Sequence, residues 1–421
     1  MEQNSLHSSL LIKAVRYKHF IFGNYKDTDS MQPKFDVHFC LISDQAAPTL
    51  LPILDGDFKP KEAVFLVSDK MKNNAEALSK IFNEKGVKTT SVRVENIYDF
   101  QAMEVLFIDL LDRYSEQNIA LNVTGGTKLM AIVAQNTFAM ADKPIFYIDS
   151  DNNQILFISR DESNRSIPNK NLNCNIDIKT YLSAYGMTFK GGKSSVSTDR
   201  LLSHFEPFVK NYDKYKDNIP LLNYYASESE RSKFKITLDD KHKKIHSFFN
   251  LLEELHHRDL VDFDHQLIDF RDRTHKELLN GIWLEELTYK AIEDIKSIQD
   301  KAMSLEVGNT AYDENKHHYD IKNQGNQNEF DIAFLAKNRL HIIECKTQVM
   351  NKSGGIKSED ILYKLEALKN YGGLMTKKCL VSYFEVPESV KNRAKELRVE
   401  IIQGKDLMRL REKLANWIGK A

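Results

Sequence analysis

The sequence has few cysteines, no long apolar run and almost no net charge. Its four cysteines include no Cys-x-x-Cys pair, which argues against a zinc module and against a disulfide scaffold. No apolar stretch approaches the roughly 18 residues that a bilayer-spanning helix needs. The first residues also lack the charged-then-apolar pattern of a secretory signal. We therefore expect a globular protein of the reducing cytoplasm, without membrane contact.

The formal net charge of −1 excludes a global electrostatic field that attracts nucleic acid. Any contact with nucleic acid must therefore come from local basic patches. With 421 residues, of which 42% are hydrophobic, the chain is long enough for two or three domains with their own cores.

From Phe35 onward, short apolar runs alternate with amphipathic segments. The pattern predicts strands at 35–42, 63–67, 87–94, 119–123 and 144–148, and helices at 74–85, 100–114 and 129–140. The run over 63–67 is apolar on both faces, as in a buried parallel strand. This alternation predicts an α/β domain with a Rossmann-like, doubly wound parallel sheet and right-handed crossovers.

In such a sheet, ligands bind beyond the carboxyl ends of the strands, so the loops at 43–49 and 124–128 should share one crevice. Glycines let a backbone approach a phosphate closely, and a helix amino-terminus offers free N–H groups. Neither G-x-G-x-x-G nor the Walker pattern is present, which disfavours NAD and ATP. Alternatively, Gly125-Gly126 only tightens a strand-to-helix turn. The candidate ligand-binding residues are Ser43, Asp44, Gln45, Thr49, Thr124, Gly125, Gly126, Thr127 and Lys128.

A second candidate site lies in a hairpin predicted over 328–346, where two apolar runs flank a polar break at 337–339. Side chains alternate along a strand, which places Glu344 and Lys346 on one face, and Asp331 on the neighbouring strand can face the same pocket. Two carboxylates and a lysine suit a hard divalent cation and the hydrolysis of a phosphodiester. The competing interpretation is an ordinary surface ion pair between Glu344 and Lys346.

Two further side chains are candidates for the same site. A helix predicted over 279–295 carries Glu285 away from its apolar stripe, with Glu286 as a competitor and a solvated glutamate as the alternative. Lys364, on a helix that begins near 360, is either a phosphate contact or part of a helix-surface ion pair. The adjacent pairs His256-His257 and His317-His318 lack the spacing of metal ligands.

The stretch Asn122-x-Thr124-Gly125-Gly126-Thr127-Lys128-x-Met130 resembles the signature of the CRISPR-associated Rossmann-fold (CARF) sensor domain, and Ser43-Asp44-Gln45 fits the loop after its first strand. The resemblance covers about 35–158. It implies a homodimer whose two crevices together bind one cyclic oligoadenylate, the second messenger of type III CRISPR immunity. Cyclic tetra-adenylate is expected in preference to cyclic hexa-adenylate.

The order of a helix with Glu, a strand with Asp and a strand with Glu-x-Lys resembles the PD-(D/E)XK nuclease superfamily. By that resemblance Glu285, Asp331, Glu344 and Lys346 match the catalytic positions, and Lys364 resembles a family lysine. Asp331 and Glu344, with Glu285, would hold Mg²⁺ or Mn²⁺. One departure from the family pattern is that no proline precedes Asp331.

Together the two resemblances imply a cyclic oligoadenylate-activated, metal-dependent endonuclease that cleaves DNA and/or RNA in type III CRISPR antiviral defence. The substrate would be single-stranded DNA or RNA, or plasmid DNA. One alternative is a ligand-controlled transcription regulator whose middle helices bind DNA. Another is a restriction-like endonuclease whose first domain is only a scaffold.

The expected domain organisation has four parts. Residues 1–32 form an extension, 33–160 the CARF-like sensor, 161–273 a linker with a helical or winged-helix connector, and 274–421 a restriction-endonuclease-like α/β domain. Within the third part, polar composition predicts linker at 164–175 and 191–195, and periodicity predicts helices at 201–215 and 243–257.

Overall fold

The computed structural model describes residues 34–160, 166–193, 197–309, 328–350, 358–368, 372–373 and 375–419. The expectations for residues 1–32 and for His317-His318 lie outside these ranges. The chain divides into two compact units, Met1–Cys174 and Asn175–Ala421, and each is described by itself. Among the helices of the described residues, none is both long and apolar enough to cross a membrane.

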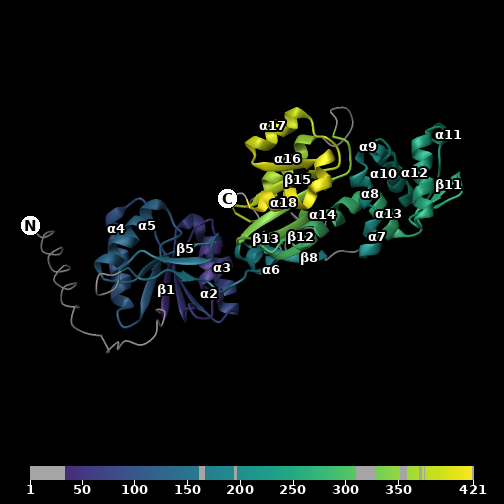
Figure 1. The fold of residues 1–421 in the computed structure, drawn as a ribbon. Helices are drawn as coiled ribbons and strands as arrows, with labels where there is room; N and C mark the ends of the chain where they lie inside the picture. Colours follow the sequence, from purple (N-terminus) through teal and green to yellow (C-terminus); the bar gives the residue numbers. More distant parts are fainter. Residues whose placement is uncertain are drawn as a thin grey trace, which may run out of the picture. The chain divides into compact units, whose positions relative to one another are not determined.

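The first unit is built on a seven-stranded sheet of order β3-β2-β1-β4-β5-β6-β7 (Figure 1). Strands β3 to β5 are parallel, whereas β6 and β7 add an antiparallel edge that periodicity did not reveal. The doubly wound parallel sheet is therefore confirmed. Its strands are β1 (Val37–Leu41), β2 (Glu62–Val67), β3 (Lys88–Arg93), β4 (Ile119–Asn122), β5 (Ile145–Asp149), β6 (Gln154–Phe157) and β7 (Lys170–Asn171).

The α-helices in the described part of this unit are α2 (Ala47–Leu54), α3 (Lys72–Glu84), α4 (Phe100–Arg113) and α5 (Lys128–Met140). Their ends follow local chemistry: the side chain of Asp99 accepts the Ala102 N–H at the start of α4. Helices α4 and α5 bury residues such as Phe107 and Phe138 against Phe39 of β1, which forms the core on this face of the sheet.

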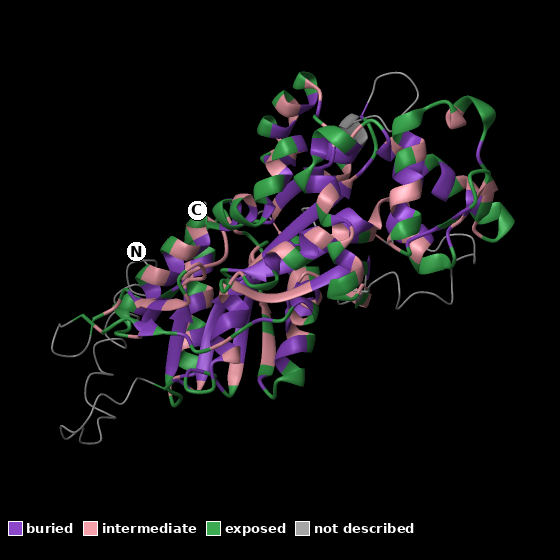
Figure 2. Cartoon of the chain, turned by 45° about the vertical axis from the view of Figure 1, so that its right-hand side comes forward, coloured by how far each residue is buried: buried purple, intermediate pink, exposed green. Residues whose placement is uncertain are grey.

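The second unit contains a six-stranded sheet of order β16-β15-β14-β13-β12-β8. Its antiparallel part joins β8, β12, β13 and β14, and β14 to β16 are parallel. In Figure 2 most strands of the two larger sheets are coloured as buried. The strands are β8 (Met187–Lys193), β12 (Ile298–Asn309), β13 (Asn328–Ala336), β14 (Arg339–Lys346), β15 (Lys377–Ser382) and β16 (Val399–Gln403).

Strand β8 includes residues that were expected to form a linker. Gly191, Gly192 and Lys193 were expected to be linker but form the end of this strand, paired with β12. A Cβ at Gly192 would lie 3.2 Å from the Ala302 side chain of β12. Backbone pairing and this close approach stabilise a strand that glycine-rich composition conceals.

The helices that cover this sheet include α14 (Trp283–Glu293), α16 (Ser358–Leu368), α17 (Glu388–Glu396) and α18 (Leu410–Gly419). The helix predicted over 279–295 is not regular throughout. Its first residues instead belong to the π-helical turn η4 (Leu278–Ile282), in which Gly281 has a φ of +126°. Only glycine adopts this conformation readily, so α14 itself begins at Trp283.

The connector between β8 and α14 begins with three short helices, where a single helix over 201–215 was expected. They are α7 (Asp199–Ser203), α8 (Glu206–Lys210) and α9 (Tyr212–Tyr215). Pro207 stands in the first turn of α8, and a proline has no N–H to continue a preceding helix. The long helix is therefore interrupted.

The rest of the connector has the element order of a winged helix. Helix α10 (Ile219–Glu228) precedes β9 (Lys235–Thr237), α11 (Asp240–Lys243) and α12 (His246–His257), and the strands β10 (Asp262–Phe263) and β11 (Leu267–Asp269) follow. The three strands form a small sheet of order β10-β11-β9. Its apolar side chains share one continuous core with those around β13, β14 and α14, so the connector and the six-stranded sheet are packed as one body.

Candidate functional site

The β13–β14 hairpin brings the three predicted hydrolytic side chains together. The paired register runs from Ala336 opposite Arg339 to Ile332 opposite Ile343, and Asp331 and Glu344 are the next residues along the two strands. The Lys346 Nζ lies 2.7 Å from Glu344 Oε1 and 3.5 Å from Asp331 Oδ2. Two carboxylates and one ammonium therefore share the end of the hairpin.

Backbone hydrogen bonds hold these side chains in place. The Cys345 N–H donates to Asp331 Oδ2 at 2.7 Å, which ties the carboxylate to the strand that carries Glu344 and Lys346. The Tyr383 N–H, just after β15, donates to the Lys346 carbonyl at 2.8 Å. The site is thus assembled on two paired strands, which restricts its motion.

A second ammonium reaches the site from α16. The Lys364 Nζ lies 2.9 Å from both carboxylate oxygens of Glu344. The Glu344 side chain is only 2% exposed, and a buried carboxylate is costly unless opposite charge compensates it. Lys346 and Lys364 supply that compensation.

Of the two neighbouring glutamates on α14, Glu285 is partly exposed and interacts electrostatically with Asp331, whereas Glu286 is fully buried. Burial, with the nearby charge of Asp331 acting in the same direction, raises the pKa of Glu285 to about 8. Burial also raises the pKa of Asp331 to about 6, with Glu344 adding to the effect and Lys346 opposing it. Burial would lower the pKa of Lys346, but Asp331 and Glu344 hold it above its usual value.

The described residues contain no ready-made group of three His, Cys, Asp or Glu side chains arranged to hold a metal ion. The donor chemistry nevertheless fits a hard cation, because all candidate ligands are carboxylate oxygens. Burial is the main cause of the raised pKa values of Glu285 and Asp331, and the negative charge of a neighbouring carboxylate adds to it. A divalent cation would offset this negative charge.

The second candidate site lies where β1 and β4 end side by side. These parallel neighbours, with Cys40 opposite Asn122, flank the point at which the strand order reverses. The Asn122 Oδ1 accepts the Thr124 N–H at 3.1 Å and its hydroxyl at 2.7 Å, and the Asn122 Nδ2 donates to the Pro48 carbonyl at 3.0 Å. Asn122 thereby links the two loops of the predicted crevice.

The glycines of the loop 124–128 have a strict packing role. A Cβ at Gly125 would lie 1.9 Å from the Leu41 carbonyl oxygen, and Gly126 has a φ of +74°. Thr127 then caps α5, because its side chain accepts the Met130 N–H at 3.2 Å. The two glycines thus form a close-packed strand-to-helix turn, and the approach of a phosphate to this turn stays a prediction.

The remaining predicted crevice residues differ in exposure. Lys128 and Asp44 are exposed, Ser43 and Gln45 are half-buried, and Thr49 is buried within α2 at 4% exposed. The Gln45 Nε2 atom is buried without a hydrogen-bond partner. An unsatisfied donor of this kind fits a ligand acceptor at this edge of the sheet.

Two groups of contact residues were not among the predicted site residues. Asn122 is part of the motif, and its position at the end of β4 could have indicated that it links the two crevice loops. Asn223 and Thr347, whose contact beside Lys346 joins the connector to the hairpin, carry no motif at all. Their contact links positions 124 apart in the sequence, and no local pattern reveals it.

Comparison with known proteins identifies the two domains that carry these candidate sites. Residues 37–181 match the family model described as "Card1 CARF domain", and residues 272–421 match "Card1-like, endonuclease domain". Together these are a sensor domain and a nuclease domain, so the chain is a CARF-domain endonuclease. Both matched regions are of the Card1 type, and the chain therefore combines a Card1-type CARF domain with a Card1-like endonuclease domain.

Two solved structures share the fold over nearly the whole chain. Protein VC1899 from Vibrio cholerae has a TM-score of 0.75 at 21% identity, and the match covers 91% of this chain and 97% of that one. Can2 from Sulfobacillus thermosulfidooxidans, in complex with cyclic tetra-adenylate, has a TM-score of 0.73 at 22% identity, over 92% and 98%. A comparison with curated proteins finds no match.

Proposed function

We propose that this chain is a metal-dependent endonuclease of the PD-(D/E)XK type, activated when cyclic tetra-adenylate binds its CARF domain. The observation that carries the proposal is the grouping of Asp331, Glu344 and Lys346 at one hairpin end, with separations of 2.7 and 3.5 Å between Lys346 and the carboxylates. The match of this region to an endonuclease family supports the same chemistry.

Each residue has a distinct role in this proposal. Asp331, Glu344 and Glu285 would hold Mg²⁺ or Mn²⁺, which would supply Lewis-acid activation and positive charge to the reaction. Lys346 orients the attacking water and stabilises the negative charge that develops on the phosphate. Lys364 neutralises Glu344 and contacts a neighbouring phosphate.

The sensor function rests on the crevice between β1 and β4. Its unpartnered Gln45 donor, the amino-terminus of α5 and the exposed Lys128 suit a phosphate-rich ligand. The complex of Can2 with cyclic tetra-adenylate supports this ring size. A homodimer would offer two such crevices to one symmetric ring, and tighter binding to the active arrangement would drive activation.

The test is to incubate the purified protein with labelled single-stranded RNA, single-stranded DNA and plasmid, in Mg²⁺ or Mn²⁺. Each reaction is run without activator, with cyclic tetra-adenylate and with cyclic hexa-adenylate. We expect cleavage only with a divalent cation and cyclic tetra-adenylate. Equal cleavage without any cyclic oligonucleotide would overturn the gating and favour a restriction-like enzyme with a scaffold domain.

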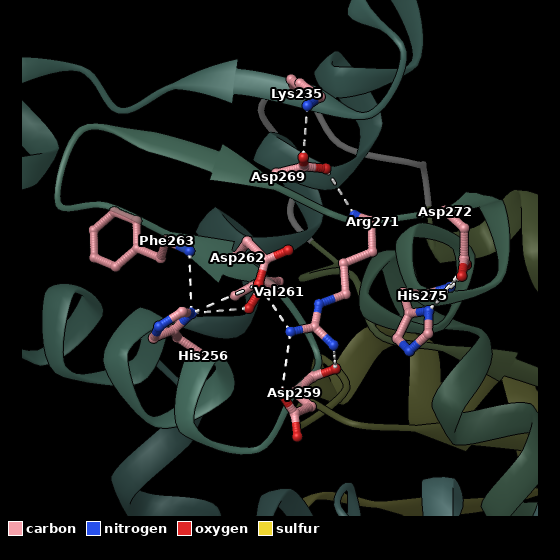
Figure 3. Close-up of polar contacts among 10 residues, drawn as sticks. All are labelled: Lys235, His256, Asp259, Val261, Asp262, Phe263, Asp269, Arg271, Asp272 and His275. Atoms are coloured by element: carbon pink, nitrogen blue, oxygen red, sulfur yellow. Dashed lines mark hydrogen bonds and ion pairs between the residues drawn. The ribbon is translucent and has the colours of Figure 1, made fainter.

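The rival function, a transcription regulator that binds DNA through the connector, gains no support from the connector's charges. Figure 3 shows two of its cations, Lys235 and Arg271, paired with acids of the same segment. Arg271 lies 2.8 Å from Asp262 and 3.2 Å from Asp259, and Lys235 lies 2.8 Å from Asp269. These two cations are therefore already paired within the connector.

A further inference from the structure

Thr347 follows directly after Lys346, at the point where β14 leaves the sheet. It is only 6% exposed. The direction of the Lys346 side chain depends on the backbone on both of its sides. Whatever fixes Thr347 therefore also fixes the position of the Lys346 ammonium relative to Glu344 and Asp331.

The residue that fixes Thr347 belongs to the connector. Asn223, on α10, donates from Nδ2 to the Thr347 carbonyl at 3.0 Å and to the Thr347 Oγ1 at 3.1 Å. Asn223 is itself buried at 6% exposed. One amide group thus holds both the main chain and the side chain of Thr347, and its loss would leave two acceptors without this donor in the interior.

The other side of Thr347 is closed by Gly281. A Cβ at Gly281 would lie 2.3 Å from the Thr347 Oγ1, so the hydroxyl packs directly against the π-helical turn η4. This turn leads into α14, the helix of Glu285, and α10 also packs against it. Thr347 is therefore held between a connector helix and the start of the Glu285 helix.

A second connector helix supports the same strand end. The Tyr383 N–H donates to the Lys346 carbonyl at 2.8 Å, and the Tyr383 hydroxyl donates to the Phe208 carbonyl of α8 at 2.9 Å. Lys346 and Thr347 are thus linked to α8 and α10 through two separate contacts.

We propose that Asn223 is a positioning residue of the nuclease reaction, acting through Thr347 on Lys346. The inference rests on the proposed nuclease function and adds the connector to the parts that the reaction needs. Displacing a catalytic group by about 1 Å can cost about 100-fold in rate, so two hydrogen bonds at the strand exit have a large effect on turnover.

The test compares full-length variants in Mn²⁺ with saturating cyclic tetra-adenylate. Asn223→Ala and Asn223→Asp, in which a carboxylate cannot donate, should lower kcat by about 10- to 100-fold with little change in KM. Thr347→Ser keeps the hydroxyl and should retain kcat. Thr347→Val should lower kcat and should have little further effect in the Asn223→Ala background, because Asn223→Ala has already removed the donor to the Thr347 hydroxyl.

Tyr225→Phe is the matched control on the same helix. The Tyr225 hydroxyl contacts His242 Nδ1 at 2.6 Å and accepts the Asp239 N–H at 3.0 Å, both within the connector. This change should lower the thermal unfolding temperature to a similar degree as Asn223→Ala and leave kcat unchanged. Equal losses of kcat in both variants would overturn the inference, because only a general structural role would produce them.

Hydrogen exchange separates this inference from the nuclease assignment. The amides around Thr347 should exchange faster in Asn223→Ala than in the wild type, whereas those of β1 should not change. Unchanged exchange at Thr347, or wild-type kcat in Asn223→Ala, would overturn the positioning role. A wild-type protein that cleaves no substrate under any condition would instead overturn the proposed function, with the exchange result still deciding whether Asn223 holds the strand end.

Discussion

The Lys364 ammonium is bound equally by both oxygens of the Glu344 carboxylate, at 2.9 Å each. This carboxylate is also a proposed cation ligand, so Lys364 competes with the cation for the same oxygens. Lys364→Met should tighten Mn²⁺ binding by roughly 3- to 10-fold and still lower the cleavage rate, because a phosphate contact is lost. Calorimetric titration with Mn²⁺ and a cleavage assay measure the two effects.

Lys391→Met is the control for that charge change. Lys391 lies in the same unit, where it pairs with Glu388 at 3.6 Å. It should alter neither Mn²⁺ binding nor cleavage. Weaker Mn²⁺ binding in Lys364→Met would contradict the competition and make the lysine a support for the cation site.

Glu344→Ala should abolish cleavage without affecting the sensor. The variant removes a proposed cation ligand and leaves Lys346 and Lys364 without their shared partner, so the rate should fall by at least about 100-fold. Binding of cyclic tetra-adenylate, measured by calorimetry, should match the wild type, since Glu344 lies in the other unit. Retained cleavage would remove Glu344 from the reaction.

Lys128→Ala should weaken activator binding and leave the nuclease site intact. The exposed lysine begins α5 beside the crevice, and its loss weakens attraction for a phosphate-rich ring. The activator concentration for half-maximal cleavage should rise by about 10-fold, with the rate at saturation preserved. An unchanged activation curve would exclude Lys128 from the ligand contacts.

Cation binding should depend strongly on pH. The folded-state pKa of Glu285 is raised to about 8 from 4.5, and that of Asp331 to about 6 from 3.8. The folded protein therefore holds protons that the unfolded chain has lost, and the stability of the metal-free protein falls as pH rises from about 4 to 8. Because a cation must displace these protons, Mn²⁺ affinity should rise over about pH 6 to 8.

Glu285→Gln provides the control for this titration. The variant should lose the part of the pH dependence nearest pH 8, and it should stabilise the metal-free protein at that pH by about 1 to 3 kcal/mol. Titrations with Mn²⁺ and thermal unfolding at several pH values measure both. An affinity for Mn²⁺ that is flat with pH would contradict the protonation of these carboxyls.

Gly125→Ala should damage the sensor crevice. The new Cβ would lie 1.9 Å from the Leu41 carbonyl oxygen, so the loop must move away from β1. We expect a loss of about 1 to 3 kcal/mol in stability and weaker binding of cyclic tetra-adenylate. Gly56→Ala is the matched control, because a Cβ there meets nothing within 4 Å. Equal behaviour of both variants would contradict a close-packed turn.

The sequence was most informative where a local pattern and the tertiary structure agree. Alternation in the β13–β14 hairpin predicts that Asp331, Glu344 and Lys346 share a pocket, and the Thr-Gly-Gly-Thr-Lys stretch predicts the turn before α5. Glu285 and Glu286 are neighbours on one helix, and only the packing of α14 distinguishes the buried residue from the one near Asp331.

Other features depend on partners that are remote in the sequence. Strand β8 was missed because its stability comes from pairing with β12, more than a hundred positions later. The contact of Asn223 with Thr347 is similar, since a single buried amide in an amphipathic helix is indistinguishable from an ordinary polar position. Such contacts become visible only in three dimensions.

The pairing of β8 with β12 limits how the protein can be dissected. A fragment cut at residue 272 would keep the matched endonuclease region but lose β8, leaving the backbone groups of β12 without their neighbour along one side. Exposed strand edges recruit other chains, so such a fragment should aggregate when expressed alone. An isolated catalytic domain for biochemical work should instead begin before Met187.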